Sequence, residues 1–148
     1  RILIVSPFVE SIKEKISIRE KIYGVDLFPD CTFVFLKPPQ TQGQIRCKDY
    51  YLELEPFYKK LDTIKDDFDV ALCSCGGYGN IVVNHIYELG KSAIYVGGVL
   101  QMYFGIYGMR WMRERKDIMK LYLNNYWSRP KEEERPEGYK NVENSAYW

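Results

Sequence analysis

The sequence predicts an α/β protein with a Rossmann-like, three-layer fold. We expect a parallel sheet of about four strands with helices on both faces, followed by an irregular, aromatic C-terminal tail. Short apolar runs alternate with stretches of helical periodicity, and glycine or proline ends most of them. This alternation is typical of βαβ units, whose right-handed crossovers connect parallel strands. The length of 148 residues suits one domain with a sizeable core.

The first strand, helix and second strand are expected before residue 37. Residues 1–6 form a nearly continuous apolar run, typical of a strand buried on both faces, and Pro7 ends it. Residues 10–23 place isoleucines at roughly helical spacing and predict a helix, with Gly24 as its C-terminal cap. Residues 33–36 predict the second strand.

The middle of the chain predicts a loop, a helix and two further strands. Residues 40–48 form a polar loop that could fold over a site. The helix that follows is expected to begin near Glu55, because Pro56 is tolerated only in a first turn. Residues 68–74 and 93–96 are apolar runs and predict the third and fourth strands.

Asn80 is expected to cap a helix between the third and fourth strands, and Gly90 to end it. A basic helix is expected over about residues 116–124, before a tail rich in proline, glutamate, arginine and aromatic residues. We expect residues 1–115 to form the Rossmann-like domain. Residues 116–148 then supply a helix and a tail that wraps the same domain.

The composition is that of a soluble globular domain, with 46% hydrophobic and 28% charged residues. The net charge of +1 argues against general nucleic-acid binding. Within residues 109–121, five basic residues face two acidic ones, so this patch could contact a phosphate or an anionic membrane, or form a solvated helix face. No run approaches the length of a membrane span, and no signal-peptide pattern opens the sequence as given. Because Arg1 already begins a predicted strand, we expect a piece of a longer polypeptide.

The four cysteines show no zinc-ligand spacing. Cys73 and Cys75 are two positions apart at a strand end, so they are expected on one side of the sheet. We expect reduced, buried thiols, a cytoplasmic protein and no metal site in these residues.

The candidate ligand site is the carboxyl edge of the sheet, where open α/β folds bind ligands. Two glycine turns end there, Gly76-Gly77-Tyr78-Gly79 and Gly97-Gly98, and Ser6 follows the first strand. Free amides and the positive end of the next helix suit a phosphate, although the glycines could simply form tight turns. The G-G-x-G pattern is not the dinucleotide fingerprint.

Gln101, Arg110 and Trp111, which follow the second glycine turn in the sequence, could also contact a ligand. Gln101 could recognise a base or a sugar hydroxyl, or could be a surface or capping residue. Arg110 with Trp111 could clamp a diphosphate and stack on a ring. The same segment could instead plug the end of the sheet.

The sequence identifies no catalytic group with conviction. His85 is the single histidine, lies in mid-helix and has no recognisable serine or cysteine partner. Asp66, Asp67 and Asp69 precede the third strand at its amino end, away from the expected site. A hydrolase with Cys75 as nucleophile lacks a histidine to activate the thiol. His85 and Glu134 remain nominal catalytic candidates.

Several spaced motifs give the chain a resemblance to a known family. It resembles uncharacterised proteins of bacterial surface-polysaccharide loci and large viruses that are described as glycosyltransferases, and the match runs from Ser6 to the end. Asn125 stands where a glutamate is common in that pattern, and Asn144-Ser145-Ala146 replaces G-G-C. The matching residues are Cys75-Gly76-Gly77-Tyr78-Gly79, Gly90-Lys91, Gly97-Gly98, Gln101, Phe104-Gly105-Ile106, Gly108, Arg110-Trp111, Asn124-Asn125-Tyr126-Trp127, Arg129-Pro130, Glu134-Arg135-Pro136, Val142-Glu143 and Tyr147-Trp148.

The resemblance implies a nucleotide-sugar-dependent glycosyltransferase domain of surface-polysaccharide or glycan biosynthesis, similar to the GT-D class. The turn at residues 76–80 would hold the donor diphosphate, assisted by Gln101 and Arg110. Tyr126, Trp127 and Arg129 would shape the acceptor or base pocket.

The resemblance implies a nucleotide sugar and a glycan acceptor as partners, and no nucleic acid. It places an R-x-G-x-x-E element upstream of this chain, where a divalent metal could bind; no cofactor is expected within the chain itself. The alternative is a non-catalytic nucleotide- or sugar-binding module, or a scaffold, paired with a separate catalytic domain. Peripheral membrane association and a homo-oligomer remain open.

Overall fold

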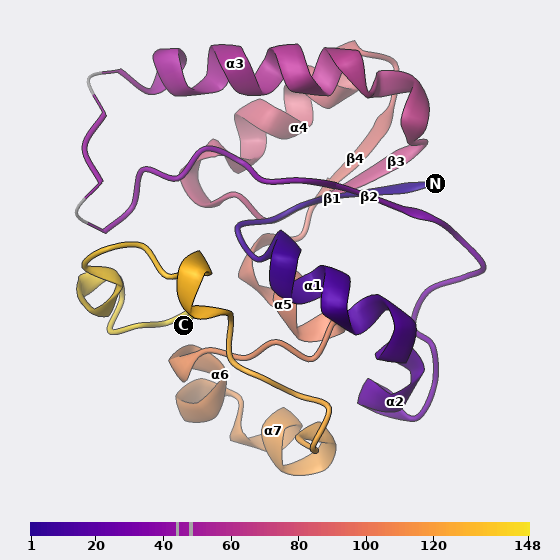
Figure 1. Cartoon of the computed structure of the whole chain (residues 1–148), viewed down its shortest axis with the longest axis vertical. Coiled ribbons are helices and arrows are strands. Elements are labelled where there is room, and N and C mark those ends of the chain that lie inside the picture. The colour runs from indigo at the N-terminus through magenta and orange to yellow at the C-terminus, as the bar shows by residue number, and fades with distance from the viewer. Residues whose placement is uncertain (44, 48) are drawn as a thin grey trace.

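The computed structural model of this chain describes residues 1–43, 45–47 and 49–148, and a four-stranded parallel sheet lies at its centre (Figure 1). The strands follow the spatial order β2-β1-β3-β4, and Ile2 lies opposite both Phe33 and Val70. The predicted α/β class with a parallel, Rossmann-like sheet is therefore confirmed. The strands are β1 (Ile2–Val5), β2 (Phe33–Leu36), β3 (Val70–Cys73) and β4 (Ser92–Tyr95).

The central strand is the most apolar one. All four residues of β1 are buried, because neighbouring strands and helices cover both of its faces. Its pairing with β2 on one side and β3 on the other leaves β4 as an edge strand, where Ile94 and Tyr95 are exposed.

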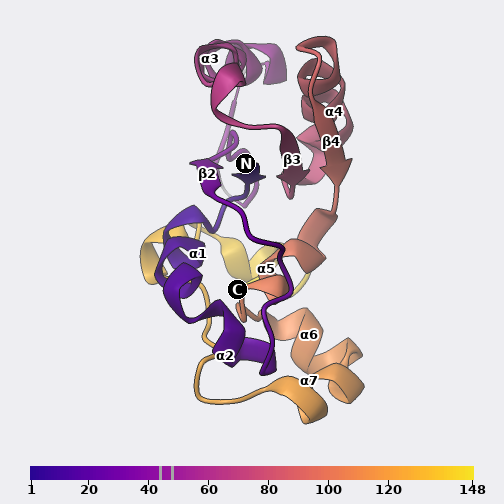
Figure 2. The ribbon, with the colours of Figure 1, turned by 90° about the vertical axis from the view of Figure 1, so that its right-hand side faces the viewer.

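Helices α3 (Tyr50–Thr63) and α4 (Gly79–Glu88) cover one face of the sheet (Figure 2). The alternate strand residues that point to this face pack against the apolar stripes of both helices. This core contains Leu3, Val5, Ala71, Cys73, Cys75, Leu54, Phe57, Leu61, Phe68, Val82 and Ile86. Both predicted cysteines thus lie in the same buried cluster.

The opposite face is covered by α1 (Val9–Lys15), α5 (Leu100–Tyr103) and the end of the C-terminal tail. Trp148 packs edge-on against Phe8, with ring centroids 6.1 Å apart. The core on this side contains Ile2, Ile4, Phe8, Ile12, Leu100, Phe104, Ile106 and Trp148. The three-layer arrangement expected from the sequence is present.

A third cluster lies beyond the sheet, at the end of the molecule that holds α2 (Arg19–Tyr23), α6 (Met109–Glu114) and α7 (Lys116–Tyr122) (Figures 1 and 2). Its buried members are Ile22, Met102, Trp111, Met119 and Trp127. The short 3₁₀ turns of the chain are Ile16–Ile18, Lys65–Asp67, Gly76–Tyr78, Gly97–Val99, Glu132–Glu134 and Tyr139–Asn141.

Two predicted helices differ from the structure. The helix expected over residues 10–23 is broken by the 3₁₀ turn, because Ile12 and Ile22 belong to different apolar clusters. The helix expected near Glu55 begins already at Tyr50, where the Asp49 side chain accepts a hydrogen bond from the Tyr51 amide at 2.8 Å.

Pro56 lies inside α3 rather than in its first turn. Proline cannot donate a hydrogen bond to the carbonyl four residues earlier, which belongs to Leu52. Both residues lie on the exposed side of the helix, where water can bind that carbonyl. The lost backbone hydrogen bond is tolerated for this reason.

The prediction that Asn80 caps α4 is wrong. The helix begins one residue earlier, at Gly79, and no side chain caps it. By contrast, Gly24 and Gly90 have the left-handed φ values, both 76°, that end helices. Among the described residues, no helix is both long and apolar enough to cross a lipid bilayer.

Candidate functional site

A pocket of about 470 Å³ opens at the carboxyl edge of the sheet, beyond β1 and β3. The chain leaves β1 toward β2 on one side and β3 toward β4 on the other, so these two strands mark the topological switch point of the sheet. Such switch points are where open α/β folds bind ligands. Six aromatic residues line the pocket: Phe8, Tyr50, Tyr78, Tyr95, Tyr147 and Trp148.

The turn after β3 forms the floor of the pocket and includes Gly76, Gly77 and Tyr78. Gly76 has a φ of 53°, a left-handed conformation that favours glycine. Position 77 does not require a glycine. Its φ is not in the left-handed region, and an added Cβ atom would have no neighbour within 4 Å. Within the described part of the chain, the Gly76 and Gly77 amides have no hydrogen-bond acceptor.

Gly79 is not among the lining residues and has a packing role instead. A Cβ atom at this position would overlap the ring of Tyr95. The Tyr95 hydroxyl in turn donates a hydrogen bond of 3.0 Å to the Gly76 carbonyl. A tyrosine hydroxyl is protonated near neutral pH and can donate this bond, and burial raises the pKa of Tyr95 further. Tyr95 therefore holds the glycine turn in place.

The loop after β2 forms a second wall. Gln40, Thr41 and Gln42 line the pocket, and Thr41 Oγ1 lies 2.9 Å from the Tyr78 hydroxyl. This is part of the loop that the sequence predicted could fold over a site. Two other residues of that loop, 44 and 48, lie outside the described residues.

The C-terminal tail forms the third wall with Glu143, Tyr147 and Trp148. Three successive non-glycine residues beside the pocket have left-handed φ values: 48° at Glu143, 54° at Asn144 and 61° at Ser145. Such conformations cost roughly 1–2 kcal/mol each for most residues, and they cluster at functional sites.

Arg110 lies behind this wall and is not among the residues that line the pocket. Its Nη1 atom donates to the Tyr147 hydroxyl at 2.7 Å, and its Nη2 atom pairs with Glu143. The guanidinium also lies 5.0 Å from the centre of the Tyr147 ring. Arg110 thus positions two lining residues, and its charge is already matched by a carboxylate.

Gly98 and Gln101 support the same wall from α5 and the turn before it. A Cβ atom at Gly98 would overlap the Tyr147 ring, so glycine allows the tail to approach closely. Gln101 is 1% exposed, and its Nε2 atom donates to the carbonyls of Ile106 and Tyr147, both at 3.3 Å. Gln101 therefore binds the tail backbone and lies outside the pocket lining.

The electrostatics of the pocket are nearly neutral. None of the described lining residues is lysine or arginine, and Glu143 is the single charged one among them. Burial raises the pKa of Cys75 to about 12 and also raises the pKa of Cys73. A thiol with such a pKa stays protonated near neutral pH and is a poor nucleophile. This disfavours the cysteine hydrolase considered above.

Several candidates lie away from the pocket. Trp111 and Trp127 are buried in the third cluster, where the Trp127 ring nitrogen donates to the Ile22 carbonyl at 3.3 Å. Tyr126 is exposed beside Lys21, and Arg129 lies over the Tyr107 ring at 5.6 Å. Ser6, Asn80 and Gly97 also lie outside the lining; Ser6 Oγ accepts the Phe8 amide at 3.2 Å.

His85 lies between α3 and α4, outside the pocket lining. Its ring is stacked on Tyr58 at a centroid distance of 3.9 Å, and its Nε2 atom is 2.8 Å from Asp62 Oδ1. The three side chains join the two helices that cover this face of the sheet. The structure gives His85 a structural role.

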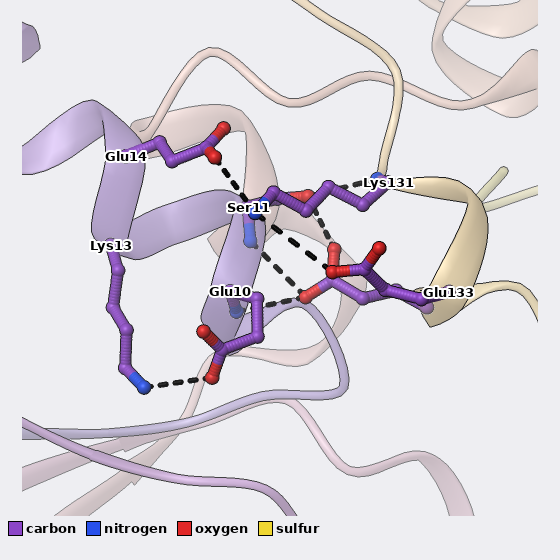
Figure 3. A network of polar contacts seen from close by, with 7 residues as sticks. Glu10, Ser11, Lys13, Glu14, Lys131 and Glu133 are labelled. Carbon is purple, nitrogen blue, oxygen red and sulfur yellow. Dashed lines mark hydrogen bonds and ion pairs between the residues drawn. The ribbon is translucent and has the colours of Figure 1, made fainter.

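Glu134 is buried and connects the tail to α1. Its Oε1 atom accepts the amides of Glu10 and Ser11 at 2.9 and 3.2 Å, and its Oε2 atom accepts the Ser11 hydroxyl. A carboxylate at a helix N-terminus satisfies free amides and interacts favourably with the helix dipole. Figure 3 shows the neighbouring contacts, in which Lys131 pairs with Glu14 at 2.7 Å. Glu134 therefore caps α1.

Sequence reasoning missed Tyr50, Tyr95, Glu143, Tyr147 and Trp148 as residues of the pocket. Tyr95 ends β4 and could have been found as an aromatic residue at the carboxyl edge. Glu143 and Tyr147 belong to the motifs of the family resemblance, but nothing local indicates that the irregular tail docks at this edge of the sheet. Among the described residues, no group of three or more His, Cys, Asp or Glu side chains is placed to hold a metal ion.

Comparisons with known proteins leave the family of this chain open. No protein-family model, no curated protein and no solved structure matches it. The function must therefore be inferred from the fold and the pocket.

Proposed function

We propose that this chain is a nucleotide-sugar-dependent glycosyltransferase domain that acts in polysaccharide or glycan assembly. The observation that carries the proposal is the pocket at the switch point, which combines unpaired amides in a glycine turn with six aromatic side chains. This combination suits a ligand with an anionic group and one or more rings. A nucleoside diphosphate sugar has both.

The donor diphosphate would lie on the amides of Gly76 and Gly77, just before α4. Backbone amides at this place bind phosphate oxygens, and the dipole of a ten-residue helix adds to the attraction. Because no lysine or arginine is among the described lining residues, these amides would stabilise the leaving diphosphate.

The aromatic side chains would hold the rings of donor and acceptor, since the faces of tyrosine and tryptophan pack well against rings that carry polar edges. Glu143 is the carboxylate of the lining, so it would accept hydrogen bonds from sugar hydroxyls. In the transfer, the bond from the sugar C1 to the diphosphate oxygen breaks, a bond to the acceptor oxygen forms, and Glu143 takes the hydroxyl proton.

Calorimetric titration with UDP, GDP and their sugar conjugates tests the donor site. We expect Gly77→Asp to abolish binding, because the added carboxylate would repel the diphosphate without disturbing any packed neighbour. Asn80→Asp is the matched control, since it adds the same charge at an exposed position outside the lining and should leave binding nearly unchanged. Absence of binding at millimolar ligand would contradict the donor-site proposal.

A second candidate is a non-catalytic sugar-binding module paired with a separate catalytic domain. The near-neutral, aromatic lining favours this reading, because a neutral sugar needs stacking faces and hydroxyl partners but no cations. The same titration distinguishes the two: a sugar-binding module would bind free mono- or oligosaccharides while nucleoside diphosphates fail to bind. It would also respond to Tyr147→Ala but not to Gly77→Asp.

A further inference from the structure

The end of the molecule formed by α6 and α7 exposes large apolar side chains together with basic ones. Leu121 is 75% exposed, and Met112, Tyr122, Leu123 and Tyr126 are exposed to a lesser extent. Isolated exposed apolar residues need no explanation, but a group of them on one short segment does.

The geometry of α7 separates its faces. Met119 is buried, and Leu121 lies on the opposite side because two residues rotate a helix by about 200°. Lys116 and Lys120 are one turn apart and share the flank between these two sides. An apolar tip therefore lies next to a basic flank.

The charges of this end are mostly positive. Residues 109–126 contain five basic and two acidic residues. Both acidic side chains are next to arginines: Glu114 lies 3.6 Å from Arg110, and Asp117 lies 3.4 Å from Arg115. Within the described part of the chain, Lys116 and Lys120 have no ion-pair partner.

The position of the segment suits contact with a flat surface. Both views place α6 and α7 together at one end of the long axis, opposite α3 (Figures 1 and 2). Trp111 and Met119 fix this end to the third cluster, so the exposed residues are presented on a packed base.

From these observations we infer that the α6–α7 end docks on an anionic lipid bilayer. Leu121, Leu123 and Tyr122 enter the headgroup region, and Lys116 and Lys120 bind the negative surface. Exposed apolar side chains beside lysines are the combination that interfacial segments use, and neither alone gives stable attachment. The inference does not depend on the proposed function.

Sedimentation with vesicles tests the inference on the full chain. We expect binding to vesicles of phosphatidylcholine with phosphatidylserine, little binding to phosphatidylcholine alone, and weakening as salt rises. Lys116→Gln with Lys120→Gln should weaken partitioning about fivefold per lysine. Leu121→Gln with Leu123→Gln should weaken it about tenfold per leucine.

The matched control is Leu52→Gln with Lys60→Gln on α3, which removes one exposed leucine and one exposed lysine from the opposite end. This variant should bind anionic vesicles as the wild type does, and circular dichroism should show all variants folded. Failure to bind anionic vesicles would overturn the inference. So would binding unaffected by the leucine changes and matched by a soluble oligonucleotide, because that would indicate a polyanion site.

Discussion

Gly77 and Gly79 belong to the same turn but have different roles, because different side chains surround them. A Cβ atom at Gly77 meets open space, whereas one at Gly79 meets the ring of Tyr95. Tyr95 also donates to the Gly76 carbonyl at 3.0 Å, so the shape of the pocket floor depends on this contact. From the sequence alone both glycines were equal candidates for close approach to a ligand.

At this scale we predict that Gly79→Ala lowers the free energy of unfolding by about 1 kcal/mol, the low end of the cost of an extra carbon in a packed place, because the obstructing atoms belong to the ring of the exposed Tyr95. The Tyr95 ring must move, and its hydrogen bond to Gly76 weakens. Urea unfolding measures the loss. Gly77→Ala is the matched control and should change stability by less than about 0.5 kcal/mol. Equal effects of the two substitutions would contradict the separate roles.

Among the elements, α1 depends on a residue that is distant in sequence. No side chain of its own first turn caps the helix, and the Glu134 carboxylate from the tail accepts its first amides instead. Lys131 reinforces the junction, because its backbone amide donates to Ser11 Oγ at 3.0 Å (Figure 3). The tail therefore stabilises a helix that begins directly after the pocket-lining residues Pro7 and Phe8.

We predict that Glu134→Ala lowers the free energy of unfolding by about 2–3 kcal/mol, because it leaves buried amides and a hydroxyl without their charged acceptor. Glu133→Ala is the control: its side chain is exposed and should cost less than about 0.5 kcal/mol. Thermal and urea unfolding measure both. If Glu134→Ala abolished sugar transfer while leaving stability unchanged, the structural role would be wrong and the catalytic one restored.

The strands were predicted from the sequence more accurately than the helix ends. Apolar runs predicted all four strands to within about two residues, because burial on both faces leaves a composition that local pattern reveals. The start of α3 was predicted too late, because Pro56 was expected to lie in the first turn of the helix. A proline can lie inside a helix when the carbonyl that it leaves unpaired is exposed to water. Glu134 was missed as a cap because the capped amides are more than a hundred residues away in sequence.

For the whole molecule, the site is assembled from segments that meet only after folding. Its floor was predictable, since parallel strands bring their carboxyl ends to one edge. The wall formed by residues 39–42 was predicted only as part of a loop that could fold over a site. The wall formed by residues 142–148 was not predictable, because an irregular segment has no periodicity that indicates its docking place. The same tail binds Gln101, Arg110 and the start of α1. The docked tail therefore completes the pocket and also contacts three other parts of the domain.

The stability of the fold should depend on pH in alkaline solution, because two partly or fully buried side chains, Tyr23 and Cys75, lose a proton there. Burial raises the pKa of Tyr23 and of Cys75 to about 12, because the charged forms lose their hydration. Both groups ionise at lower pH in the unfolded chain, near pH 10 and about 8.5. The stabilisation they provide is fully present below about pH 8 and is lost as pH rises through the folded pKa values.

We therefore predict that the free energy of unfolding falls from about pH 9 to pH 12, by at most about 1.4 kcal/mol per pH unit for each group. Urea unfolding at a series of pH values measures the slope. Tyr23→Phe removes one titrating group and should flatten the fall above pH 10, although it also loses the 2.8 Å hydrogen bond to the Met102 carbonyl. Tyr87→Phe removes the same hydroxyl from an exposed side chain and is the matched control. A stability that stays constant or rises over this range would show that water reaches Tyr23 and Cys75, which would mean that the packing around the third cluster and the pocket floor is looser than the structure indicates.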